Sequence, residues 1–316
     1  MFQSVRGVAR GYRPMQNASD VAVTSQPQYR RSHGQGWLWI AVALTALTGC
    51  AAPSTAVSPG DGVAVKPASE IRRLVPAAQV ERSAAQQFES IKRQAAQKKA
   101  LVPDTDPQLQ RLRQIAQRLQ PHAYGWNPDA RRWQWEVILL RSDQVNAFCM
   151  PGGKIAFYTG ILNKLQLNDN EVAAIMGHEM AHALREHARA QMAKSQLTDI
   201  GASVLSELLG FGQAGRQVLG YGGQLLGLKF SRDDETDADL VGLDISARAG
   251  YDPRSAVSLW RKMQAQSKGA PPQWLSTHPS SGSRIEEISR VLPRVLPLYA
   301  QATGKRLDDL GPDPSQ

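Results

Sequence analysis

Apolar residues recur at helical spacing along most of the chain, and this spacing predicts a series of amphipathic helices. Two helices come first, because apolar side chains return every three or four residues within 78–99 and 107–120. A break around Pro103 and Pro107 separates them. The same periodicity predicts further helices over 169–194, 197–209, 232–248, 253–267 and 282–292.

A shorter segment between these helices has a period of two and predicts strands. Apolar and polar residues alternate from Trp133 to Leu139, and such alternation places the apolar set on one face of a strand. Residues 151–153 (PGG) predict a turn, and Lys154–Tyr158 (KIAFY) reads as a second short strand. We therefore predict an α+β, mainly helical fold with a small antiparallel sheet ahead of the long helix 169–194.

The helix predicted over 169–194 contains the sequence His178-Glu179-Met180-Ala181-His182. Residues four apart share one face of a helix, so both imidazoles can bind one zinc ion. Glu179 then lies beside the metal, where it can take a proton from bound water. The motif predicts a zinc metallopeptidase with one Zn²⁺ per chain, His178 and His182 as ligands and Glu179 as catalytic base.

Catalytic zinc needs a third protein ligand and a fourth position that stays open. The metzincin pattern requires glycine at 185 and histidine at 188, but Arg185 and Ala188 occupy these positions. His187, one position away, is therefore interpreted as a structural or surface histidine. The acidic stretch after Ser231 offers Glu235 as the third ligand instead. Asp239, one helical turn further on, is predicted to accept the free ring N–H of a ligand histidine.

Four separate segments together resemble one known family. Besides the HEMAH sequence and the Glu235–Asp239 stretch, these are Asn146–Phe148 with the following PGGKI turn, and Thr277-His278-Pro279 with Arg284-Ile285. They are similar to the gluzincin family of HtpX and the CAAX prenyl protease, especially its soluble periplasmic lipoprotein branch of the LoiP and BepA type without C-terminal repeats. The resemblance implies a zincin-type metallopeptidase domain over 77–305.

The resemblance also places His278 and Arg284 at the catalytic cleft. Either residue could stabilise the oxyanion of the tetrahedral intermediate. His278 has two alternative roles: a fourth zinc ligand in a resting state, or a plain surface histidine. The strand Lys154–Tyr158 is interpreted either as an ordinary sheet strand or as an edge that binds extended substrate by strand addition.

The first 49 residues read as a bacterial lipoprotein signal peptide. Trp37–Gly49 is a run of 13 uncharged residues behind a basic stretch, too short to span a bilayer. Leu47–Cys50 resembles a lipobox, in which the cysteine is lipidated and becomes the first mature residue. We predict lipidation at Cys50 with translation from Met1 or Met15. Neither Ala51 nor Ala52 is acidic. In Gram-negative lipoproteins the lack of this inner-membrane retention signal implies an outer-membrane anchor facing the periplasm.

Composition favours a flexible tether over 50–76, which is rich in Ala, Ser, Pro and Gly, and a disordered tail over 306–316. The formal net charge is +9, but residues 1–49 contribute five arginines against one acid. Beyond them, basic and acidic residues are mixed, which is typical of a solvated surface and argues against nucleic-acid binding.

Two functions are consistent with these features. The first is a zinc endopeptidase that cleaves misfolded or misassembled outer-membrane and periplasmic proteins, with unfolded envelope polypeptides as its partners. The second is a largely latent zinc domain that acts as a chaperone or assembly factor for outer-membrane proteins.

Overall fold

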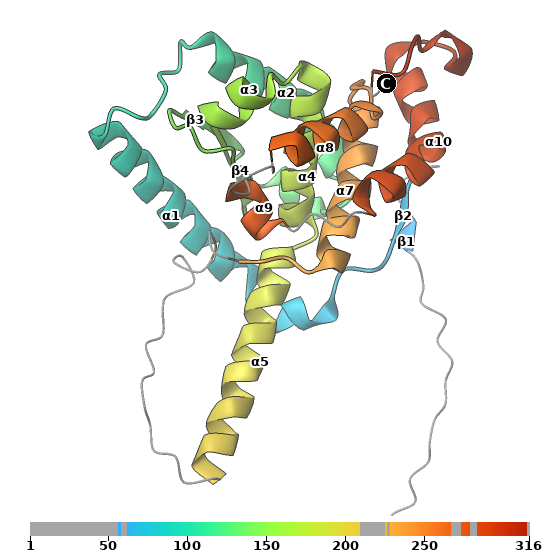
Figure 1. Ribbon diagram of the computed structural model, residues 1–316. Helices are drawn as coiled ribbons and strands as arrows, with labels where there is room; N and C mark the ends of the chain where they lie inside the picture. Colours follow the sequence, from blue (N-terminus) through green and yellow to red (C-terminus); the bar gives the residue numbers. More distant parts are fainter. Residues whose placement is uncertain are drawn as a thin grey trace, which may run out of the picture. The chain divides into compact units, whose positions relative to one another are not determined.

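The computed structural model describes residues 56–57, 62–208, 225, 228–266, 273–278 and 283–314, without the side chains of 56–57, 198–208 and 273. Its α-helices are α1 (Ala77–Gln97), α2 (Pro107–Ala123), α3 (Thr159–Leu165), α4 (Asp169–Leu184), α5 (His187–Leu208), α7 (Arg232–Arg248), α8 (Ser255–Gln266), α9 (Gln273–Thr277) and α10 (Arg284–Thr303). The 3₁₀ turns are η1 (Glu70–Leu74), η2 (Pro128–Arg131) and η3 (Leu307–Asp309). The strands are β1 (Ala56–Val57), β2 (Ala64–Val65), β3 (Glu136–Leu140), β4 (Ala147–Met150) and β5 (Lys154–Tyr158). The predicted mainly helical α+β fold is confirmed (Figure 1).

The three-stranded sheet is mixed, and this corrects the predicted antiparallel sheet. Its order is β3-β5-β4, with β3 parallel to β5 and β4 antiparallel to β5. The sequence predicts strands over 133–139 and 154–158, and the structure adds β4, which pairs with β5 across the 151–153 turn. Lys154–Tyr158 is therefore the central strand, and β4 is the edge on the side of the H-E-x-x-H helix.

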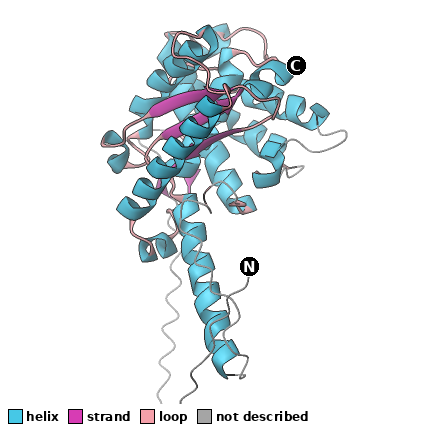
Figure 2. Cartoon of the chain, turned by 90° about the vertical axis from the view of Figure 1, so that its left-hand side faces the viewer, coloured by secondary structure: helices cyan, strands magenta, loops and turns pink. Residues whose placement is uncertain are grey.

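Helices cover both faces of this sheet (Figure 2), so β3 and β5 are buried except at Glu136, Lys154 and Tyr158 at their ends. Val137 and Leu139 of β3 belong to the main core with residues of α2 and α4. Ile138, between them, faces the opposite way and packs with Phe88 of α1. Burial on two faces explains why the apolar run of β3 is nearly continuous rather than strictly alternating.

The long helix predicted over 169–194 is divided in two. A capping box between Asn168 and Glu171 starts α4, as polar residues before an apolar run predict. Glu186 then adopts a left-handed backbone conformation, with φ of +58°, and α5 begins at the next residue. Because the direction changes here, α5 leads away from α4 (Figure 1).

Both ends of the domain reach further than predicted. From residue 62 the expected tether is packed on the domain: Val63, Val65 and Val75 are buried. The expected disordered tail is bound as far as Gly311, because the Arg254 guanidinium donates hydrogen bonds to the carbonyls of Leu310 and Gly311. Segments whose composition is typical of linkers thus pack on the domain through buried apolar side chains and hydrogen bonds to their backbone carbonyls.

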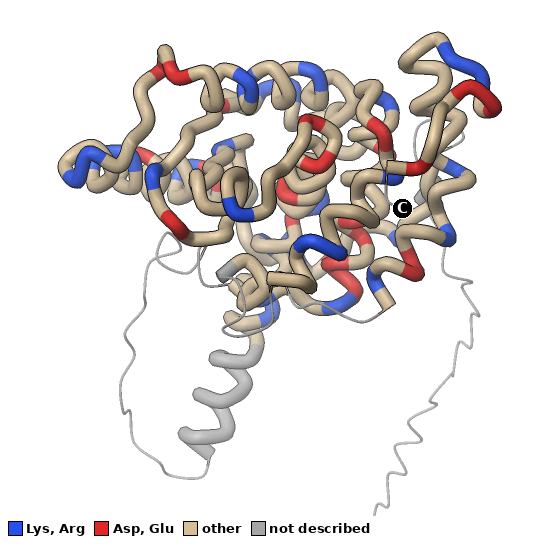
Figure 3. The backbone as a smooth tube through the Cα atoms, turned by 45° about the horizontal axis from the view of Figure 1, so that its top comes forward, with Lys and Arg blue, Asp and Glu red and all other residues tan. Residues whose placement is uncertain are grey.

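Basic and acidic residues are intermixed over the described chain (Figure 3), as the sequence predicts. Among the described residues, no helix is both long and apolar enough to cross a membrane. The predicted signal peptide and Cys50 lie outside the described residues.

Candidate metal centre and catalytic site

The core helix α4 presents both histidines of the H-E-x-x-H motif on one face. His178 and His182 are 4% and 3% exposed, and their Nε2 atoms lie 3.1 Å apart. Burial lowers the pKa of His182 well below its ordinary value, although Glu235 opposes the shift. His182 is therefore neutral at physiological pH, and a neutral imidazole is the form that binds metal.

Helix α7 brings the predicted carboxylate to the two histidines. The Glu235 oxygens lie 3.4 Å from Nε2 of His182 and 3.6 Å from Nε2 of His178. Burial by itself raises the pKa of this carboxyl, but hydrogen bonds from His182 and His278 outweigh it and hold the pKa well below the usual range. Glu235 is thus an anionic donor inside an otherwise closed site.

His278, which follows the short helix α9, completes the group. Its Nδ1 atom lies 3.0 Å from Oε1 of Glu235 and 3.4 Å from Nε2 of His178. One donor atom from each of His178, His182, Glu235 and His278 falls within 4.8 Å of all the others. The structure therefore places His278 in the site itself and not on the surface.

The geometry of this four-residue group fits zinc. Bonds of about 2.0–2.1 Å in a tetrahedral arrangement separate neighbouring ligand atoms by about 3.3 Å. The separations between donor atoms given above, 3.0 to 3.6 Å, bracket this value. Two or three imidazoles with one carboxylate form a donor set that zinc accepts readily.

Asp239 and Arg284 lie directly behind the ligands. Asp239 Oδ1 lies 2.9 Å from Nδ1 of His178, as the sequence predicts for a carboxylate that orients a ligand. Arg284 donates to both Asp239 oxygens at 2.6 and 2.7 Å and to Glu235 Oε2 at 2.5 Å. Its guanidinium also stacks on the Trp260 ring at 3.8 Å.

These contacts correct the oxyanion role expected of Arg284. The side chain is 2% exposed, and its nitrogens face the carboxylates behind the metal position. Arg284 therefore pairs with two buried carboxylates, those of Asp239 and Glu235. Burial works against its charge, but Asp239 and Glu235 raise the pKa of Arg284 above its ordinary value.

Glu179 faces the same group of residues from α4. Its Oε1 accepts a hydrogen bond of 2.6 Å from the Trp274 indole N–H and lies 3.5 Å from Nε2 of His278. Trp274 is 1% exposed and its ring stacks on that of His278. Sequence reasoning missed Trp274; the available signal was a tryptophan just four residues before the H-P pair.

His187 is also part of this neighbourhood, which the sequence did not predict. The expected structural or surface histidine is 5% exposed, and its Nδ1 lies 3.0 Å from Nδ1 of His182. The left-handed Glu186 turns the chain back, so a residue five positions after His182 can still reach it. An uninterrupted helix would have placed the side chain on another face.

A groove opens beside the ligands, between β4 and the segment before α7. Its polar lining includes Glu179, His182 and His278, and its apolar lining includes Ala147, Phe148, Met150, Ala183, Ala188, Leu225, Leu228 and Phe230. Phe230 stacks on the His182 ring with centroids 3.9 Å apart. Cys149 also lines the groove, but burial raises the pKa of its thiol, so it is protonated and a poor nucleophile.

Comparisons with known proteins match the same region. The family described as Peptidase family M48 matches residues 107–292. The mitochondrial metalloendopeptidase OMA1 of Arabidopsis thaliana is 36% identical over 174 residues, covering 54% of this chain and 35% of that protein. The OMA1 of Saccharomyces cerevisiae is 30% identical over 228 residues, covering 68% and 64%.

A bacterial relative aligns over a similar length. The beta-barrel assembly-enhancing protease of Escherichia coli is 28% identical over 210 residues, which cover 63% of this chain and 42% of that protein. The chain thus spans between about a third and two thirds of the length of these curated relatives.

Proposed function

This chain belongs to peptidase family M48 and is a metalloendopeptidase, and from this premise we propose that it is a zinc enzyme with His178, His182 and Glu235 as permanent ligands. The observation that supports this best is the convergence of one donor atom from each of these buried residues within 4.8 Å of the others, with Glu179 3.5 Å from His278. Asp239 and Arg284 hold the ligands in place without touching substrate.

Glu179 is the catalytic base in this proposal. Zinc, when bound, makes a water more acidic and polarises the scissile carbonyl. Glu179 takes the proton from that water and then passes it to the leaving amine, because it lies at the border between the ligands and the groove. Trp274 fixes one carboxylate oxygen through its indole N–H, which leaves the other oxygen for proton transfer.

His278 is proposed to cap the metal in a resting state. Its Nδ1 lies 3.0 Å from Oε1 of Glu235 and 3.4 Å from Nε2 of His178, so it would take the fourth ligand position, where water must bind for hydrolysis. Substrate cleavage then requires His278 to leave this position. Burial lowers the pKa of His278, but Glu179 and then Glu235 raise it above its ordinary value, which favours the imidazolium form that cannot bind metal and so favours release of this position.

The substrate is proposed to be an extended polypeptide. The edge strand β4 runs along the groove and can form backbone hydrogen bonds with a substrate strand, which do not depend on side-chain identity. The apolar lining around Phe148 and Phe230 accommodates apolar side chains. Unfolded proteins expose such segments, so we expect broad specificity for unfolded chains.

The bacterial envelope is the proposed location. The Escherichia coli relative is named a beta-barrel assembly-enhancing protease, and the lipobox-like Leu47–Cys50 suits a lipid anchor at the outer membrane. The OMA1 relatives are named mitochondrial. We take from them only the peptidase domain that they share with this chain, and not their location. We propose cleavage of misfolded or misassembled outer-membrane and periplasmic proteins.

A scaffold role is the second candidate, favoured by the capped position of His278. In that case the domain acts as a chaperone or assembly factor and its chemistry is seldom used. Expression of Glu179→Gln in a strain that lacks the gene separates the two. Loss of rescue supports the peptidase, and full rescue of every envelope phenotype supports the scaffold.

The peptidase proposal is tested by cleavage of unfolded casein by the purified protein. Removal of metal with a chelator should abolish cleavage, and one equivalent of Zn²⁺ should restore it. Cleavage that persists in metal-free protein would contradict a zinc mechanism.

A further inference from the structure

A chain of hydrogen bonds leads from His182 away from the metal position. Nδ1 of His182 lies 3.0 Å from Nδ1 of His187, and Nε2 of His187 lies 3.0 Å from Oδ2 of Asp237. Arg185 donates its Nε–H to the same Asp237 oxygen at 2.6 Å. All of these groups are buried or nearly so, with the His187 side chain 7% and the Asp237 side chain 16% exposed.

Only one arrangement of protons satisfies this chain when His182 is a metal ligand. Nε2 of His182 faces the other donors and must be free of hydrogen to bind metal. The ring proton of neutral His182 is then on Nδ1, where it is donated to Nδ1 of His187. Neutral His187 carries its own proton on Nε2 and donates it to the carboxylate of Asp237.

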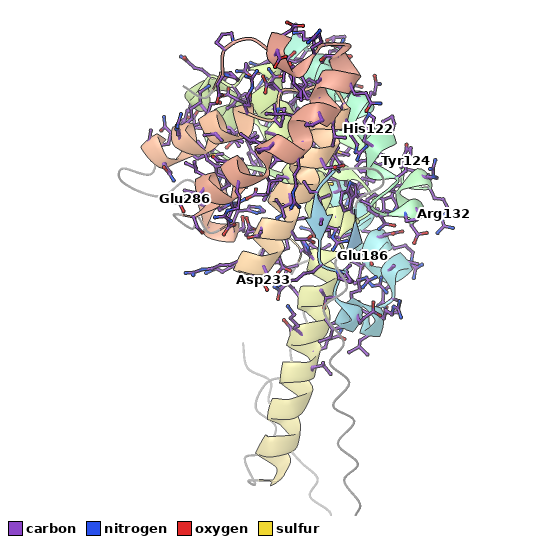
Figure 4. The ribbon with its side chains drawn as sticks, turned by 90° about the vertical axis from the view of Figure 1, so that its right-hand side faces the viewer. His122, Tyr124, Arg132, Glu186, Asp233 and Glu286 are labelled. Carbon is purple, nitrogen blue, oxygen red and sulfur yellow. The ribbon has the colours of Figure 1, made fainter. Side chains whose placement is uncertain are left out.

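The residues of this hydrogen-bonded series come from different elements: His187 from α5, Asp237 from α7, and Arg185 from the end of α4. Asp237 lies on α7, two residues after Glu235, so a displacement of the ligand helix moves both carboxylates together. Arg185 bridges to the N-terminal segment, because its Nη2 donates to the backbone carbonyl of Lys66. That segment is in turn held at the α4–α5 junction, where Arg72 pairs with Glu186 at 2.7 Å. Figure 4 labels Glu186.

The other ligand histidine, His178, has a similar but shorter series of partners. Nδ1 of His178 is bonded to Asp239, which Arg284 holds in place. His182 has a histidine between its ring and the carboxylate, but the order of imidazole, carboxylate and arginine is otherwise the same. Orienting partners of this kind fix the tautomer of a ligand imidazole and raise its basicity.

We propose that His187 and Asp237 are positioning residues of the zinc site, which hold His182 in its metal-binding tautomer and orientation through a relay anchored by Arg185. This inference rests on the proposed zinc site. Loss of the relay should weaken zinc binding by about 10- to 100-fold, the usual effect of removing an orienting partner.

The test is zinc affinity of the full-length protein, measured by competition with a chromophoric chelator for wild type, His187→Ala, His187→Asn and Asp237→Asn. Asparagine can place an acceptor oxygen near the position of Nδ1, so His187→Asn should bind zinc more tightly than His187→Ala. His122→Gln is the matched control, because His122 lies on α2 and contacts none of the proposed ligands. Circular dichroism of each metal-free protein establishes that it is folded at the temperature of the measurement.

Cobalt provides a second measurement that a merely structural role would not change. The visible absorption of Co²⁺ bound to folded His187→Ala should differ from that of wild type, because the ring of His182 is no longer held in place. Zinc affinity in His187→Ala within about threefold of wild type, or equal affinities in His187→Ala and His187→Asn, would overturn the relay. Wild type that binds no zinc would instead refute the zinc site and the relay with it.

Discussion

Gly242 of α7 lies directly against the backbone of His178 in α4. A Cβ atom on residue 242 would be 2.7 Å from the His178 nitrogen, well inside van der Waals contact. Gly177 meets α7 in the same way: a Cβ atom on residue 177 would be 2.8 Å from the carbonyl oxygen of Gly242. This close crossing brings Glu235 and Asp239 within reach of His178.

Replacing Gly242 by alanine should therefore damage the metal site from a distance. The added methyl group forces α7 away from α4, which carries Glu235 and Asp239 away from the histidines. We expect a loss of about 1–3 kcal/mol in the free energy of unfolding together with at least tenfold weaker zinc binding. Both are measured on purified protein, by urea unfolding and by chelator competition.

Gly304→Ala is the control for this prediction. Gly304 has a positive φ of +67° but no atom within 4 Å of its missing Cβ. Its substitution should cost some stability through backbone strain and leave zinc affinity unchanged. Unchanged zinc affinity in Gly242→Ala would show that the crossing does not set the ligand geometry.

Arg284→Met should strongly destabilise the protein. The substitution leaves Asp239 and Glu235 buried without a cation, and breaking a buried ion pair from one side costs about 3–5 kcal/mol. Arg132→Met is the comparison, because its pair with Asp129 is exposed and worth at most about 1 kcal/mol. Equal losses in the two variants would contradict the positioning role of Arg284.

Acid should remove part of this stability through Asp239. Burial raises the pKa of Asp239, but Arg284 and His178 lower it by more. The pKa of Asp239 therefore lies below the unfolded value of about 3.9. A carboxyl with a lowered pKa contributes its stability fully above the unfolded pKa and loses it as pH falls through the folded pKa. Metal-free wild type should thus lose stability more steeply below about pH 4 than Asp239→Asn. Parallel curves would rule this contribution out.

His278→Ala should increase proteolysis, because the fourth position becomes free for water. The readout is the initial rate of casein cleavage, compared with zinc content so that loss of metal is not mistaken for loss of activity. A lower rate at full zinc content would instead favour His278 as the oxyanion donor. An unchanged rate would contradict both roles.

The sequence predicted the local parts of this site well. A five-residue helical motif fixes the spacing of His178 and His182, and it needs no knowledge of distant contacts. The strand character of β3 and β5 is local in the same sense. Glu235 and Asp239 could be named because zinc needs a third ligand and their E-x-x-x-D spacing places both carboxylates on one face of a helix.

Features that depend on tertiary contacts were not predicted. Nothing local to His187 shows that the left-handed Glu186 aims it at His182, and nothing local to Arg284 shows that its charge is used on Asp239 and Glu235. The parallel pairing of β3 with β5 depends on where the chain turns between strands. Val63 and Val75 lie in linker-like sequence and are ordered only by the surfaces they meet.

The most direct test of the zinc peptidase is the comparison of wild type with Glu179→Gln for zinc content and for cleavage of an unfolded substrate. Both proteins should bind one zinc per chain, because Glu179 is not a ligand. Wild type should cleave casein, and Glu179→Gln should be slower by at least about a hundredfold. Wild type without zinc and without activity, or Glu179→Gln with full activity, would contradict the central claim.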